Sequence, residues 1–186
     1  LGAISQRFQP SLIFIANPNN PTGAVVGKDD IDRLFNILKK WPDCILVADE
    51  IYDGLDFSNQ QVSAASRSDS TPVVTMNGVS KVYYAPGWRI GYMALHDPTK
   101  RLGLVRDGIE RLLRSRLCAS TPAQLGYLAG LKGDRSWMDV YAERVMKQRD
   151  HCLKRIAGIE GLEVEQPGGA FYMFIRLTDK HWAADD

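Results

Sequence analysis

One strand–helix–strand pattern near the start of the chain limits the fold more than any other feature of the sequence. Two short apolar runs, residues 12–16 and 44–48, flank a segment, residues 31–38, in which apolar side chains recur at helical spacing. Two strands joined by a helix in this way imply a right-handed crossover between parallel neighbours. The sequence therefore predicts an α/β fold built on a largely parallel sheet.

The rest of the chain changes from strands to helices and back. Two apolar runs, residues 72–76 and 90–95, predict further strands, and the short loop before the second suits antiparallel pairing. The later elements are expected to be helices at residues 99–116, from about Pro122, and at 136–157, and strands at 162–165 and 170–177.

Composition excludes several classes of protein. The 186 residues are 45% hydrophobic and 24% charged, which is typical of a globular protein rather than a disordered or fibrous one. The net charge of +1 gives no electrostatic reason to expect nucleic acid or an anionic membrane as a partner. No apolar run is long enough to cross a bilayer, so we expect a soluble, cytoplasmic protein. The first residue is Leu1 rather than Met, so we also expect a longer open reading frame.

Cysteine and histidine give no sign of a metal site or of a disulfide framework. These residues are widely spaced along the chain: Cys44, Cys118, Cys152, His96, His151 and His181. Zinc sites need closely spaced pairs of such ligands. We therefore expect no bound metal and reduced thiols.

Three short motifs carry groups suited to catalysis. The first, Asn-Pro-Asn-Asn-Pro-Thr-Gly at residues 17–23, directly follows a predicted strand. These residue types are common in turns, and an ordinary loop is the alternative interpretation. Loops that leave the carboxyl ends of parallel strands are also where α/β proteins bind ligands. Two prolines would stiffen this loop and hold an asparagine amide in one place.

The second motif places Asp49 at the end of an apolar strand, with Tyr52 three residues later. The carboxylate could simply cap the end of the strand and be hydrated there. A carboxylate flanked by apolar residues needs a cation or a hydrogen-bond donor to offset its loss of hydration. Tyr52 could direct its phenol into the same crevice, or it could be a core residue.

The third motif combines Ser80 and Lys81 with Arg89, which lies between two glycines. A planar guanidinium makes two parallel hydrogen bonds to a phosphate. A lysine near another cation, and partly removed from water, loses its proton more readily, as a Schiff-base nucleophile must.

In this order the three motifs resemble the class I aminotransferases among the fold-type I enzymes that use pyridoxal 5'-phosphate (PLP). Four stretches, residues 77–81, 116–119, 121–124 and 167–174, look most like the alanine and aspartate aminotransferase subgroup. The resemblance covers residues 12–177. It implies transamination, in which an amino group passes between an amino acid and a 2-oxo acid through a Schiff base.

The resemblance also implies roles for individual residues. Lys81 would form the Schiff base with PLP, and Asp49 would pair with the pyridine nitrogen. Asn20 and Tyr52 would bind the ring oxygen O3′, and Arg89 the phosphate. Lys81, Asp49 and Tyr52 are then the catalytic residues.

One position departs from the family pattern, because Gly78 stands where many relatives have a phosphate-binding serine. Ser80 is the remaining serine candidate for a cofactor contact.

The implied fold is the fold-type I large domain, a mostly parallel seven-stranded sheet flanked by helices and here incomplete, with the beginning of an α+β small domain. We expect residues 1–144 to belong to the large domain and residues 145–186 to the connector helix and the small domain. Family members are about twice as long, so the chain resembles a central fragment. The N-terminal phosphate loop and the arginine that binds the substrate carboxylate would lie outside it. A homodimer is expected of the full-length protein, and little activity of this portion alone.

The sequence is also compatible with other functions. A PLP-dependent carbon–sulfur β-lyase would keep the same cofactor residues, and a non-catalytic fragment is a further alternative. The basic segment 100–116 could bind an acidic partner, or could be a solvated helix whose apolar stripe packs inward. A nicotinamide-binding domain is disfavoured, because no GxGxxG motif follows a predicted strand.

Overall fold

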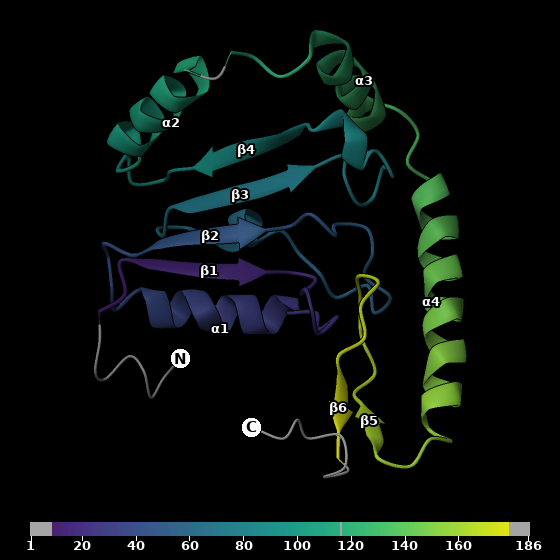
Figure 1. Ribbon diagram of the computed structural model, residues 1–186. Coiled ribbons are helices and arrows are strands. Elements are labelled where there is room, and N and C mark those ends of the chain that lie inside the picture. Colours follow the sequence, from purple (N-terminus) through teal and green to yellow (C-terminus); the bar gives the residue numbers. More distant parts are fainter. Residues whose placement is uncertain (1–8, 116, 179–186) are drawn as a thin grey trace, which may run out of the picture.

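The computed structural model describes residues 9–115 and 117–178 (Figure 1). Four strands form a mixed sheet in the order β1-β2-β3-β4. Strands β1 (Leu12–Ala16), β2 (Ile45–Asp49) and β3 (Val73–Gly78) are parallel, and β4 (Gly91–His96) pairs antiparallel to β3. The predicted parallel crossover is confirmed, and so is the antiparallel fourth strand. Arg116 and His181, considered above, lie outside the described residues.

The main core lies between the sheet and helix α1 (Lys28–Leu38). Ile31 and Leu38 on the helix and Leu46 on β2 are almost completely buried, with 0%, 1% and 0% of their surfaces exposed. Burying a side chain of this size contributes roughly 1.5–3 kcal/mol. The helical spacing seen in the sequence therefore places one apolar stripe of α1 against the sheet. Two short 3-10 helices, Ala64–Arg67 and Pro86–Trp88, lie in the connections before β3 and β4.

The second helix begins four residues later than the sequence pattern predicts, at residue 103 rather than 99. Helix α2 spans Gly103–Ser115, because the carboxylate of Asp97 accepts backbone hydrogen bonds from Arg101 (2.9 Å) and Leu102 (2.8 Å) and holds this stretch as a turn. None of the described side chains of α2 is buried, so the structure does not bear out the alternative in which its apolar stripe packs inward. Helices α3 (Thr121–Lys132) and α4 (Trp137–Ile156) lie close to the predicted ranges.

The chain ends in a small antiparallel pair, β5 (Leu162–Val164) and β6 (Ile175–Leu177). The strand predicted over residues 170–177 forms only in its last three residues. Ala170 has a left-handed backbone (φ 56°), and its N–H donates to the carbonyl oxygen of Leu55 at 2.7 Å, so this stretch is a turn fastened to the large sheet's loops.

Among the described residues, no helix combines the length and the apolar character needed to span a bilayer.

Candidate active site

The sequence motifs meet at one edge of the large sheet. Asn20 follows β1, Asp49 is the last residue of β2, and Lys81 comes three residues after β3. Since these strands are parallel and adjacent, their carboxyl ends lie at the same edge. Arg89 precedes β4, which runs the opposite way, so it returns to that edge too. In Figure 1 this edge faces α4, with the segment before β6 between them.

The loop after β1 is fastened by side chains that do not serve as site candidates. The amide of Asn17 donates to the carbonyl oxygen of Val26 (2.9 Å) and accepts from its N–H (2.8 Å). Asn19 accepts a hydrogen bond from the hydroxyl of Thr22 at 2.7 Å. These three bonds close the loop on itself, and Asn20 is exposed.

Neighbouring acids at the end of β2 have different environments. Glu50 is buried and accepts hydrogen bonds from the Ser63 hydroxyl (3.0 Å) and the Ala64 N–H (2.9 Å). Burial raises the pKa of Glu50 above its usual value, although these two bonds oppose the effect. Asp49 is half-buried, and its carboxylate accepts one bond from the Ile51 N–H at 3.1 Å. Glu50 thus fixes a loop, and Asp49 retains lone pairs for a ligand.

Tyr52 is buried beneath the lysine. The Nζ atom of Lys81 lies 5.9 Å from the centre of the Tyr52 ring and 5.8 Å from that of Phe171. Burial raises the pKa of Tyr52 most strongly, whereas the side chain of Asn20 lowers it. Tyr52 therefore keeps its proton at neutral pH, and it lies close to both Asn20 and Lys81.

The phosphate candidates are less closely associated with these side chains. Arg89 is exposed, in a left-handed conformation (φ 50°), and its guanidinium donates to the carbonyl oxygen of Pro86 at 2.8 Å. A Cβ atom added to Gly78 would lie 2.9 Å from the carbonyl oxygen of Ile90, so this position has no room for a serine without a local shift. Ser80 is half-buried on the same loop as Lys81.

Two aromatic residues at this site were not predicted as site residues. The hydroxyl oxygens of Tyr52 and Tyr172 are 2.5 Å apart, and the ring of Phe171 meets that of Tyr52 edge-on, with 5.2 Å between centroids. Phe171 and Tyr172 both follow the Gly-Gly pair at residues 168–169. Two aromatic residues after two glycines are the one feature of the sequence that could have drawn attention to them. Because 120 residues separate Tyr172 from Tyr52, only the fold shows their contact.

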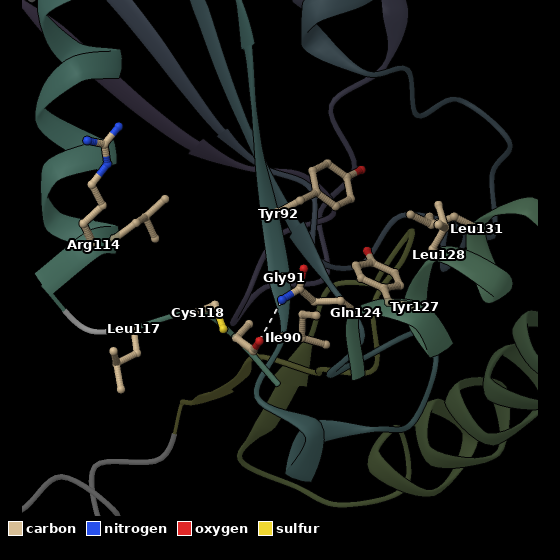
Figure 2. Close-up of a pocket in the computed structure, with 12 residues that line it drawn as sticks. Ile90, Gly91, Tyr92, Arg114, Leu117, Cys118, Gln124, Tyr127, Leu128 and Leu131 are labelled. Atoms are coloured by element: carbon tan, nitrogen blue, oxygen red, sulfur yellow. Dashed lines mark hydrogen bonds between the residues drawn. The ribbon is translucent and has the colours of Figure 1, made fainter. Parts of the chain in front are cut away.

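A separate apolar hollow lies beside β4 (Figure 2). Its volume is about 690 Å³, and its lining includes Tyr92, Leu117, Tyr127 and Leu128. Figure 2 shows Leu117 across the hollow from Tyr127. None of the side chains that carry the predicted chemistry contributes to its lining.

In comparisons with known proteins, one family matches nearly the whole chain. The family model described as aminotransferase class I and II matches residues 2–186. The chain is 33% identical to alanine aminotransferase of Mycobacterium tuberculosis (strain H37Rv) and 35% identical to glutamate-pyruvate aminotransferase AlaA of Escherichia coli (strain K12), over 177 residues in each case. These matches include 94% of this chain but 41% and 44% of the two relatives.

Solved structures agree with the sequence matches. The structure of alanine aminotransferase from Pyrococcus furiosus superposes with a TM-score of 0.90 at 39% identity, covering 96% of this chain and 46% of that one. The chain thus spans less than half the length of these relatives, and its sheet has the architecture of their fold-type I structures. It belongs to the aminotransferase class I and II family.

Proposed function

We propose that this chain supplies the cofactor-binding core of a PLP-dependent aminotransferase, which moves an amino group between an amino acid and a 2-oxo acid. One observation carries the proposal most strongly. Asn20, Asp49 and Lys81 follow the carboxyl ends of three adjacent parallel strands, with Lys81 above the buried Tyr52. Lysine, carboxylate, amide and phenol are thereby brought to one edge of the sheet.

The chemistry of these groups fits PLP. The amine of Lys81 suits the aldehyde of the cofactor, with which it would form a Schiff base. The carboxylate of Asp49 suits a protonated ring nitrogen. Tyr52 and Asn20 offer hydrogen-bond donors to the ring oxygen. Arg89 uses one of its five N–H groups on Pro86 and keeps the others for a phosphate.

Each residue would then have a defined task. When bound, PLP supplies an electron sink that stabilises the charge left as a substrate loses its α-proton. The Nζ atom of Lys81 would accept that proton and later give it up again, so that Lys81 would act as the general base. Asp49 would keep the ring nitrogen protonated, and Tyr52, which is neutral, would donate to the ring oxygen. The same residues would hold PLP in a homodimer of the full-length protein.

A pair of lysine variants tests the nucleophile. The protein mixed with PLP is expected to develop visible absorbance, and Lys81→Ala is expected to abolish it. Lys100→Ala is the matched control, because Lys100 is exposed and follows the carboxyl end of β4, at the edge of the sheet opposite the site. Equal colour in both variants would contradict the assignment of Lys81.

Product analysis tests the reaction. With the full-length protein, alanine and 2-oxoglutarate are expected to give pyruvate and glutamate without release of ammonia. Ammonia as the main nitrogen product from a sulfur amino acid would instead identify a β-lyase.

A further inference from the structure

The geometry points to Tyr172 as a positioning residue for the cofactor site: its hydroxyl donates a hydrogen bond to Tyr52, so that the proton of Tyr52 is directed at the ring oxygen of the cofactor. The two hydroxyl oxygens lie 2.5 Å apart. Their rings meet edge-on at 5.4 Å, which fixes their relative orientation. This inference rests on the proposed function and extends it to a residue outside the three motifs.

The segment that carries Tyr172 is attached to both sides of the site. The N–H groups of Gly168 and Gly169 both donate to the carbonyl oxygen of Gly23, each at 2.9 Å. On the other side, the Ala170 N–H donates to Leu55 at 2.7 Å, three residues after Tyr52. Tyr172 thus follows a turn whose backbone is tied to the loop of Asn20 and to the turn of Tyr52.

The number of protons decides the direction of the bond. A neutral phenol has a single proton and can donate one hydrogen bond while accepting others. If Tyr52 donated to Tyr172, it would have no proton left for a cofactor oxygen. If Tyr172 donates instead, Tyr52 remains a donor toward the site, and the bond it receives makes its own O–H a stronger donor. Burial keeps Tyr52 neutral, which this arrangement requires.

The hydroxyl of Tyr172 can be removed with little change in packing. Its ring packs against Phe171, with centroids 4.8 Å apart, and Tyr172→Phe keeps that contact. Tyr83 provides a matched control. It belongs to the same apolar cluster, and its buried hydroxyl bonds no other group among the described residues.

The test is a pH titration of the visible absorbance of the PLP-loaded protein. A weaker donor at the ring oxygen disfavours the deprotonated form of the chromophore, so Tyr172→Phe is expected to raise the midpoint by about half to one pH unit. Tyr52→Phe is expected to raise it more. Adding Tyr172→Phe to Tyr52→Phe is expected to cause no further shift, because the effect passes through Tyr52. Tyr83→Phe is expected to leave the midpoint unchanged.

The outcomes separate this inference from the proposed function. An unchanged midpoint in Tyr172→Phe, or shifts that add in the double variant, would overturn the role of Tyr172 while colour that depends on Lys81 still supports the enzyme. If the wild-type protein takes up no PLP, or its colour persists in Lys81→Ala, the proposed function fails and this inference fails with it.

Discussion

At the scale of single residues, burial separates side chains that the sequence presents together. Asp49 and Glu50 are adjacent acids, yet Glu50 is 6% exposed and bonded to a loop, whereas Asp49 is half-buried at the edge of the sheet. The sequence motif alone could single out Asp49, because it ends the apolar run. It could not show that Glu50 has structural partners, because Ser63 and Ala64 lie 13 and 14 residues further along the chain.

Substitution of Glu50 tests the effect of its burial. The pKa of Glu50 is raised in the folded protein, mainly by burial, so its stabilising contribution is greatest below pH 4.5 and decreases as the pH rises through the folded value. Glu50→Gln keeps both accepted hydrogen bonds without the charge. We expect its free energy of unfolding at pH 7 to equal or exceed that of the wild type, with a smaller decrease above pH 4.5.

Glu50→Ala serves as the comparison for this variant. It removes the acceptor of two hydrogen bonds and is expected to lower the free energy of unfolding by about 1–3 kcal/mol. Denaturant unfolding at pH 4 and pH 7 measures all three proteins. A Gln variant that is less stable than the wild type at pH 7 would show that the ionised carboxylate is stabilising.

At the scale of elements, periodicity predicted most of the strands and helices, including the exposed helix α2, and failed at residues 170–174. The run at residues 12–16 coincides with β1, and the spacing across residues 31–38 falls within α1, since both pack into the main core. Residues 170–174 of the strand predicted at 170–177 do not form a strand. The N–H groups of Gly168 and Gly169 donate to Gly23 and that of Ala170 donates to Leu55, and no local pattern records these bonds. The shared edge of the motifs could be predicted, since parallel strands bring their ends together.

Gly23 lies where the loop after β1 contacts the turn around residues 167–170, and it offers a test of that contact. Its backbone is left-handed (φ 69°), and a Cβ atom there would lie 2.5 Å from the Cβ of Pro167. Gly23→Ala is therefore expected to lower the free energy of unfolding by about 1–3 kcal/mol. Gly108→Ala, inside α2 with nothing near its Cβ position, is expected to raise stability by up to about 1 kcal/mol.

Thermal and denaturant unfolding of the two alanine variants check this prediction. Equal stability of Gly23→Ala and the wild type would mean that the loop and the turn at Pro167 are not in the close contact described.

At the scale of the whole molecule, the buried core and the exposed apolar surface lie on different parts of the chain. Helix α2 and its neighbourhood expose large apolar side chains, among them Leu112 (69%) and Leu113 (63%). Monomeric proteins rarely expose extended apolar patches. The sequence could not reveal that the apolar side chains of α2 are exposed, because an amphipathic stripe has the same pattern whether or not another element covers it. The domain division at residues 144 and 145, which falls inside α4, stays a prediction.

Charged substitutions on α2 test this exposure. The 186-residue polypeptide is expected to bind a hydrophobic dye, and the double variant Leu112→Glu, Leu113→Glu is expected to bind less of it without a measurable loss of stability. Leu46→Ala, in the core, is the control and is expected to cost about 2–5 kcal/mol. A large loss of stability in the double variant would mean that α2 packs inward after all.

The covalent attachment of PLP to one lysine tests the central claim most directly. Borohydride reduction of the PLP-treated protein, followed by mass spectrometry of its peptides, locates the modified lysine. We predict a phosphopyridoxyl group on Lys81, in preference to exposed lysines such as Lys100 and Lys132. Modification spread evenly over surface lysines, with Lys81 unmodified, would contradict the account.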